Sequence, residues 1–156
     1  MYKRQTENVP GIAAFAKAIE LATGELDISR KHLEMLKERL ADGIQERIEL
    51  VYRNGSPTEC LPNILNMSFA GVDGEALLLN LDFMGVAVST GSACSSGATE
   101  PSHVLLAMGV DPLLAQASLR FSFGRDNTEE QIDRVVEVLP GIVNRLRDLG
   151  DERAKR

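Results

Sequence analysis

A long apolar stripe near the C-terminal end limits the folds that are open to this chain. Apolar side chains recur there at helical spacing, at Ile132, Val135, Val136, Leu139, Ile142, Val143, Leu146 and Leu149. Thr128 and Gln131 stand before the stripe in the order of a capping box, which marks the start of a helix. A helix with one apolar face must bury that face against another layer of structure. The stripe therefore predicts a layered domain, and Pro140 within it predicts a kink in the helix.

The segments before this helix read as short strands and helices in alternation. Helical spacing of apolar residues predicts helices over residues 10–24 and 25–48, and Gly43 is expected to loosen the last turns of the second one. Alternating or short apolar runs predict strands at residues 50–52, 64–69, 86–88 and 118–123. Asp73 and Ser102 can cap two further short helices, and Asp111-Pro112 opens a third. This order predicts an α+β (α/β layer) domain, with a small antiparallel or mixed sheet covered by helices.

Residues 89–102 differ in kind from the rest of the chain. Apart from Cys94, this stretch holds only small, polar or turn-forming residues, so we expect an exposed, mobile loop. A thiol there has no apolar side chains to bury it, and a nucleophilic thiol needs the reach and solvent access that such a loop provides. Cys94 is therefore the first candidate for a reactive residue, and an inert, buried cysteine is the alternative.

The other cysteine, Cys60, is expected to be packed, because it stands beside Leu61 and Pro62 just before a strand. Two cysteines are too few for a disulfide framework or a structural zinc site, and no metal-ligand cluster is apparent. A reducing, cytoplasmic setting is expected, and it disfavours a bridge between Cys60 and Cys94.

Arg120 is the second candidate. Strand alternation places it on the same face as Ser122 and opposite Phe121, so its charge needs a partner. The commoner partner is a local Asp or Glu, and the alternative is a ligand carboxylate held by two hydrogen bonds. The two histidines, His32 and His103, are far apart and are interpreted as surface residues rather than as catalytic bases.

Charge and hydropathy exclude several classes of partner. The net charge of −6 argues against binding of nucleic acid, which requires a basic face. The apolar stretches fall short of the ~20 residues that cross a bilayer, and no secretory signal follows the first residues, so no membrane partner is expected. The lysines are interpreted as solvated, at Lys3, Lys17, Lys31, Lys37 and Lys155.

Several ordered motifs over residues 6–143 resemble those of the cysteine desulfurases, pyridoxal-phosphate enzymes of the class V aminotransferase superfamily and of fold type I. The segments that carry the resemblance are Thr6-Glu7-Asn8-Val9-Pro10-Gly11, Leu61-Pro62-Asn63 with Asn66 and Ser68, Gly74-Glu75-Ala76-Leu77-Leu78, Gly91-Ser92-Ala93-Cys94-Ser95-Ser96-Gly97, Glu100-Pro101-Ser102-His103-Val104-Leu105 and Leu119-Arg120-Phe121-Ser122-Phe123-Gly124-Arg125. One such motif alone is a weak signal, and the ordered set is a strong one.

The resemblance implies an activity and roles for three residues. In this family a loop cysteine takes the sulfur of L-cysteine as a persulfide, L-alanine is released, and the sulfur passes to acceptor or scaffold proteins for iron–sulfur clusters or tRNA thiolation. Cys94 matches the attacking cysteine, Arg120 matches the arginine that binds the substrate carboxylate, and Thr6 matches a threonine that reaches the cofactor phosphate of the other subunit in the family's homodimer.

The chain also departs from the family pattern. The lysine that carries pyridoxal 5′-phosphate lies in a Ser/His/Lys-containing segment that has no match here, and Gln5 stands where the family has glycine. We therefore expect residues 1–24 to be a segment and helix left from a missing cofactor domain, residues 25–150 to be the C-terminal small domain, and residues 151–156 to be a disordered tail. Such a chain is expected to be inactive alone.

Two alternatives remain open at this point. One is a non-catalytic module that accepts a persulfide on Cys94 from another enzyme. The other is a piece of a related class V enzyme, such as a selenocysteine lyase or an aminotransferase. The loop cysteine favours the desulfurase over a plain aminotransferase, which needs no thiol there.

Overall fold

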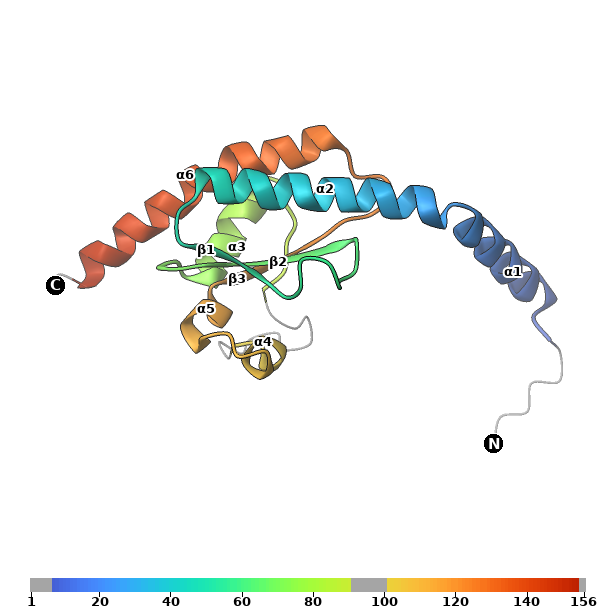
Figure 1. The fold of residues 1–156 in the computed structure, drawn as a ribbon, viewed down its shortest axis with the longest axis horizontal. Helices are drawn as coiled ribbons and strands as arrows, with labels where there is room; N and C mark the ends of the chain where they lie inside the picture. The colour runs from blue at the N-terminus through green and yellow to red at the C-terminus, as the bar shows by residue number, and fades with distance from the viewer. Residues whose placement is uncertain (1–6, 91–100, 155–156) are drawn as a thin grey trace.

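A computed structural model describes residues 7–90 and 101–154. Three strands form an antiparallel sheet in the order β1-β2-β3: β1 (Val51–Asn54), β2 (Ile64–Phe69) and β3 (Ser118–Ser122). Three long helices cover one face of this sheet: α2 (Leu26–Arg47), α3 (Gly74–Phe83) and α6 (Glu129–Ala154). Two short helices lie on the other side, α4 (His103–Ala107) and α5 (Pro112–Gln116), as Figure 1 shows. The predicted α+β fold, a small antiparallel sheet covered by helices, is confirmed.

The hydrophobic core lies between the sheet and the three long helices. Leu65, Met67 and Phe69 point from β2 into this core, while Asn66 and Ser68 alternate to the opposite face. The predicted stripe of α6 supplies the opposite wall, with Leu139 and Val143 fully buried. The apolar periodicity of the sequence therefore identified both sides of the core correctly.

Local signals in the sequence predicted most element ends. Asp73 accepts a hydrogen bond from the Ala76 amide at 2.8 Å at the start of α3, and Asp111 does the same for the Leu113 amide at 2.9 Å at the start of α5. At the start of α6, the amide of Gln131 donates to Thr128 Oγ1 and the amide of Thr128 donates to Gln131 Oε1, as in a capping box. Ser102 precedes α4, although its side chain makes no capping hydrogen bond.

Gly43 has a packing role that its helix propensity did not indicate. Helix α2 continues through it to Arg47. A Cβ atom at this position would stand 2.7 Å from Cγ2 of Val136 on α6, so the missing side chain lets the two long helices approach each other. Gly43 is therefore a packing residue between α2 and α6.

One other expectation needs correction. Residues 86–88 form no strand: only Ser89 makes an isolated bridge, to Arg120, because the sheet ends at β3 and this segment merely runs along its edge. Helix α6 continues to Ala154, and the expectation of a disordered tail over residues 151–156 remains a prediction. Pro140 lies inside α6, and Figure 1 shows that helix bending near its middle.

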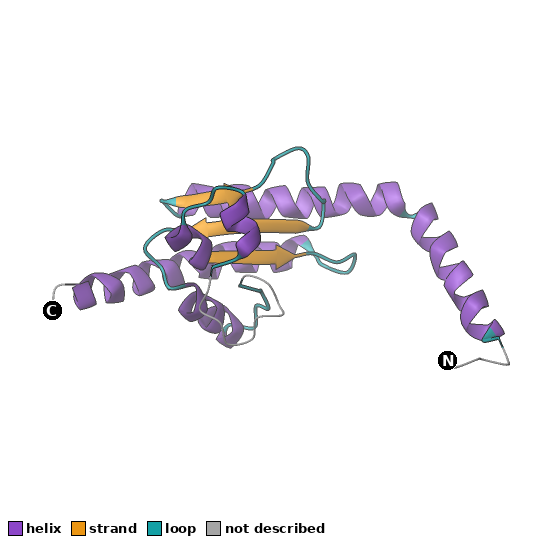
Figure 2. Ribbon diagram, turned by 90° about the horizontal axis from the view of Figure 1, so that it is seen from below, coloured by secondary structure: helices purple, strands orange, loops and turns teal. Residues whose placement is uncertain are grey.

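The first helix, α1 (Val9–Gly24), stands apart from the rest of the domain. It projects away from the sheet beyond the start of α2 (Figure 2) and contains no buried residue. Its apolar side chains Val9, Ile12, Phe15 and Ile19 are 65%, 58%, 68% and 50% exposed. The division into residues 1–24 and 25–150 remains a prediction, and this geometry is compatible with it.

Candidate active site

The candidate site is built on the sheet face that points away from the three long helices. Strand register places Asn54 opposite Asn66, Asn66 opposite Arg120, and Arg120 opposite Ser89. Because residues directly opposite one another on paired strands project to the same face, these four side chains form one line across the sheet. We call Asn54, Asn66, Arg120 and Ser89 the polar row.

Hydrogen bonds fix one end of the polar row. The Nδ2 atom of Asn54 donates to Asn66 Oδ1 at 2.6 Å and to Ser68 Oγ at 2.7 Å. Ser68 is fully buried, so the asparagine amide satisfies a hydroxyl that would otherwise be costly to bury. These bonds hold the side chain of Asn66 beside Arg120.

Arg120 occupies the centre of the row. It is half-buried, and its strand neighbours Leu119 and Phe121 point the other way, into the core, as the alternation predicted. Its cross-strand neighbours, Asn66 and Ser89, are uncharged. Within residues 7–90 and 101–154, its guanidinium makes no ion pair, so the commoner expectation of a local Asp or Glu partner finds no support there. A half-buried guanidinium without a carboxylate partner is suited to receive one from a ligand.

The backbone of Arg120 is tied to the start of the glycine- and serine-rich segment. The amide of Arg120 donates to the Ser89 carbonyl at 2.7 Å, and the amide of Ser89 donates to the Arg120 carbonyl at 3.2 Å. The segment that starts there leads on to α4, on the same side of the sheet (Figure 1). Cys94 and Thr6, the other two residues singled out in the sequence, lie outside the described residues.

The described residues do not supply the anchor of a pyridoxal phosphate cofactor. Such an anchor is a lysine amine that binds the cofactor covalently. Lys17 and Lys31 are exposed on helices, and the amine of Lys37 is hydrogen-bonded to Cys60 Sγ. None of these three described lysines lies on the strands that carry the polar row.

Lys37 and Cys60 are both placed otherwise than expected. Lys37 was interpreted as solvated and is 3% exposed, while Cys60 was interpreted as packed and is exposed. The ammonium of Lys37 donates to Cys60 Sγ at 3.1 Å. The sequence contained a signal for the burial of Lys37, because this residue stands four residues after Leu33 and three before Leu40, beside the apolar stripe of α2. No signal in the sequence indicated that the loop before β2 would place Cys60 over this lysine.

Two more charged groups adjoin this pair. Arg53 on β1 donates to both carboxylate oxygens of Glu38, at 2.6 and 3.0 Å. This hydrogen bond lowers the pKa of Glu38 and raises the pKa of Arg53. The Lys37 ammonium is 3.5 Å from the same carboxylate.

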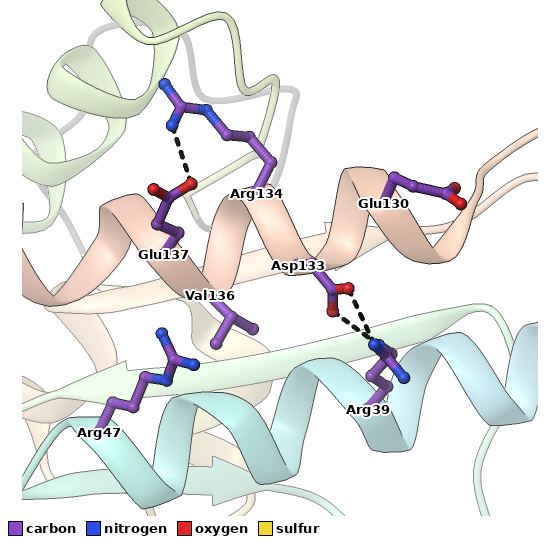
Figure 3. Close-up of a pocket in the computed structure, with 7 residues that line it drawn as sticks. All are labelled: Arg39, Arg47, Glu130, Asp133, Arg134, Val136 and Glu137. Atoms are coloured by element: carbon purple, nitrogen blue, oxygen red, sulfur yellow. Dashed lines mark hydrogen bonds and ion pairs between the residues drawn. The ribbon is translucent and has the colours of Figure 1, made fainter.

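A third group of charges lines a hollow between α2 and α6 (Figure 3). Arg39 donates to both oxygens of Asp133, at 2.7 and 2.8 Å, and Arg134 pairs with Glu137 on the same helix. The Arg39 hydrogen bond lowers the pKa of Asp133. Because these charges neutralise one another across two helices, we interpret the hollow as a structural ion-pair network rather than as a ligand site.

The histidines take no part in the candidate site. His32 was expected to be solvated, but it is half-buried and its Nε2 lies 2.9 Å from the carbonyl oxygen of Asn127. His103 is exposed at the start of α4. No group of three or more metal-binding side chains occurs in the part of the chain that the structure describes. Among the same residues, no helix combines the length and the apolarity that crossing a membrane requires.

Comparison with known proteins identifies the family of the chain. The family model of class V aminotransferases matches residues 1–135. Cysteine desulfurase IscS of Methanosarcina thermophila is 49% identical over 144 residues, which cover 92% of this chain and 35% of that protein. Cysteine desulfurase IscS of Clostridium botulinum is 47% identical over 149 residues, which cover 94% of this chain and 38% of that protein. The chain thus spans little more than a third of the length of these relatives.

The fold of the chain is also similar to that of solved structures of related proteins. A NifS-like protein superposes with a TM-score of 0.76 and 35% sequence identity, over 92% of this chain and 36% of that one. The shared fold is that of helices with a small antiparallel sheet. The chain therefore belongs to the class V aminotransferase family and is a homologue of the cysteine desulfurases within it.

Proposed function

We propose that this chain supplies the substrate-binding arginine and the sulfur-accepting thiol of a cysteine desulfurase. The observation that carries the proposal is the guanidinium of Arg120, which is half-buried in a row of uncharged side chains and makes no ion pair with the described residues. The carboxylate of L-cysteine would neutralise the positive charge of this guanidinium and accept two parallel hydrogen bonds from it. Asn66, held in place by Asn54, adds a second polar group beside it.

The connection between Arg120 and Ser89 supports a role for Cys94 at the same site. Cys94 follows Ser89 by five residues, and a fully extended chain of that length spans at most about 18 Å. In this proposal the thiol of Cys94 takes the sulfur of the substrate whose carboxylate Arg120 binds. The reaction L-cysteine plus thiol gives L-alanine plus persulfide, so it balances without an outside oxidant or reductant.

The cofactor contributes the chemistry that breaks the carbon–sulfur bond of the substrate, by accepting electrons from it. The described residues include no lysine positioned for pyridoxal phosphate, so in this proposal another polypeptide segment holds it. Thr6 is proposed, from the family resemblance alone, to contact the cofactor phosphate in a homodimer. Alone, the chain is expected to release no alanine from L-cysteine. In the complete enzyme, the persulfide on Cys94 is expected to pass to an acceptor or iron–sulfur scaffold protein.

A fused protein tests the proposal. The part of the Methanosarcina thermophila relative that this chain does not match is joined in front of residues 1–156, and alanine and persulfide are measured with L-cysteine and pyridoxal phosphate. We expect both products from the fused protein, and expect Cys94→Ser to abolish persulfide formation. The fused Arg120→Met protein should have a KM for L-cysteine that is roughly 10- to 100-fold higher, because the charge-assisted pair between the guanidinium and the substrate carboxylate is lost.

Arg125→Met is the matched control, because Arg125 is exposed and, among the described residues, pairs only with Glu25 and Asp126, at 3.6 Å each. Its KM should stay that of the unmodified fused protein. If Arg120→Met leaves KM unchanged, Arg120 does not bind the substrate carboxylate. If the persulfide forms without Cys94, the thiol assignment is wrong.

A further inference from the structure

The side-chain amide of Asn66 stands beside Arg120 with its oxygen bonded and its nitrogen unused. Strand β2 lies between β1 and β3, so Asn66 has Asn54 opposite it on one side and Arg120 on the other. The Oδ1 atom of Asn66 accepts a hydrogen bond from Asn54 at 2.6 Å, which turns this oxygen toward β1. The oxygen and the nitrogen of an amide lie on opposite sides of its carbon, so the NH2 group faces β3 and Arg120.

The two groups that meet on this side of β2 are both hydrogen-bond donors. Among the described residues, neither the NH2 group of Asn66 nor the guanidinium of Arg120 has a hydrogen-bond acceptor. Both side chains are half-buried, so water reaches them only in part. Donors in such a place are costly to leave unpaired, and an ionised carboxylate offers about four lone-pair sites and no hydrogen. The pair therefore favours a carboxylate over a ligand group that donates.

We propose that Asn66 is a second binding residue for the carboxylate of L-cysteine, and that Asn54 is the positioning residue that directs its NH2 group. The inference rests on the proposed function, in which Arg120 binds the same carboxylate. The Cβ atoms of residues opposite one another on paired strands are about 5 Å apart, so one carboxylate can contact both side chains. Arg120 supplies the charge, and Asn66 disfavours a ligand, such as a carboxamide, that would turn a hydrogen toward its NH2 group.

Asn54 is itself held from the buried side of the sheet face. Its Nδ2 atom also donates to Oγ of Ser68 at 2.7 Å, and Ser68 is 0% exposed. The two hydrogens of this nitrogen thus serve two acceptors. In the variant Asn54→Asp an oxygen replaces the nitrogen, so the NH2 group of Asn66 would turn toward β1 and its oxygen toward Arg120. This variant reverses the amide of Asn66 while residue 66 itself is unchanged.

Binding of L-cysteine to the full chain tests the inference without turnover. In ¹H–¹⁵N NMR spectra, the Nε–H signal reports on Arg120 and the side-chain NH2 signals report on Asn66. We expect both to shift over the same range of L-cysteine concentration, and neither to shift with cysteamine, which is L-cysteine without its carboxylate. A shift at Arg120 without one at Asn66 would overturn this inference and leave the proposed function intact. No shift at Arg120 would be evidence against the proposed function, on which this inference rests.

Variants of the fused protein measure the contribution of each asparagine. Asn66→Ala should raise the KM for L-cysteine about tenfold, because one hydrogen bond to a charged group is lost. Asn54→Asp should raise KM to a similar extent. In both variants kcat should be nearly unchanged, as expected when an interaction is equal in the bound substrate and the transition state. Asn144→Ala, at an exposed position of α6, is the matched control and should leave KM unchanged.

Circular dichroism shows whether each variant folds. If KM is unchanged in Asn66→Ala and raised in Arg120→Met, Asn66 does not bind the carboxylate. An unchanged KM in a folded Asn54→Asp variant would overturn the positioning role of Asn54. If either variant does not fold, the NH2 signals of Asn66 in the unmodified chain decide.

Discussion

Lys37 and Glu38 are adjacent on α2 and form an ion pair, but their side chains differ in exposure. Lys37 is buried under the connection before β2, while the adjacent Glu38 is 44% exposed on its side chain and binds Arg53. A carboxylate bound in this way is harder to protonate in the folded chain than in the unfolded one, so its pKa falls below the ordinary value of 4.5. The stability that it contributes is therefore present above pH 4.5 and is lost as the pH falls through the lowered pKa.

The substitution Glu38→Gln tests how far the stability of the fold depends on pH through this carboxylate. We expect the variant to lose less thermal stability than the unmodified chain when the pH is lowered from 7 into the range below 4, because its side chain cannot be protonated. The measurement is the midpoint of thermal unfolding across that range. Glu34→Gln is the control, since Glu34 pairs with Arg30 on the outer surface of the same helix. An acid dependence as steep in Glu38→Gln as in the unmodified chain would contradict the prediction.

Helix α2 illustrates, at the scale of an element, how packing overrides local propensity. Gly43 lowers the intrinsic stability of the helix by roughly 1 kcal/mol relative to alanine. The same glycine lets α2 meet Val136 of α6, where a Cβ atom would come to 2.7 Å. The contact between the two longest helices of the domain depends on this absence of a side chain.

Gly43→Ala should therefore destabilise the domain by about 1–3 kcal/mol, as overpacking does, in spite of its better helix propensity. Gly141→Ala is the matched control on α6, because nothing lies within 4 Å of the added carbon there. That control should stabilise the domain by up to about 1 kcal/mol. Urea denaturation measures both free energies of unfolding.

A double substitution decides whether Val136 is the cause. Gly43→Ala combined with Val136→Ala removes the methyl groups that the new carbon would meet, so the two effects should be non-additive and the double variant should recover part of the loss. Strict additivity would show that the cost of Gly43→Ala arises elsewhere.

At the scale of the whole molecule, α1 is an apolar helix without a covered face. Its apolar residues are half or more exposed, and the core consists of residues from α2 onward. Residues 1–24 are therefore expected to add almost nothing to the stability of the isolated chain. Their exposed apolar surface is expected to promote association between copies.

Removal of residues 1–24 should thus leave the thermal midpoint of unfolding within about 2 °C of the full chain, because no core contact is lost. Sedimentation velocity should show less self-association than for the full chain. Leu36→Ala is the positive control for core damage, since Leu36 is 0% exposed and should cost about 2–5 kcal/mol. A large fall in the midpoint after truncation would show that α1 belongs to the folding unit.

The sequence alone predicted what depends on neighbours along the chain. The apolar period of α6, the capping box at Thr128, the Asp caps of α3 and α5 and the alternation of β2 are set by residues within a few positions of one another. Alternation likewise placed Arg120 on the face opposite Phe121. Loop composition and motif resemblance identified Cys94 as a candidate, and its surroundings lie outside the described residues.

Only the tertiary structure decided which distant residues meet. The antiparallel order β1-β2-β3 aligns Asn54, Asn66, Arg120 and Ser89 in one row, and no local pattern contains that register. The approach of α6 made Gly43 a packing residue, and the connection before β2 buried Lys37 beneath Cys60. The physical reason is common to all three cases. Short-range propensity acts along the backbone, whereas burial, charge pairing and close approach depend on segments that the fold brings together.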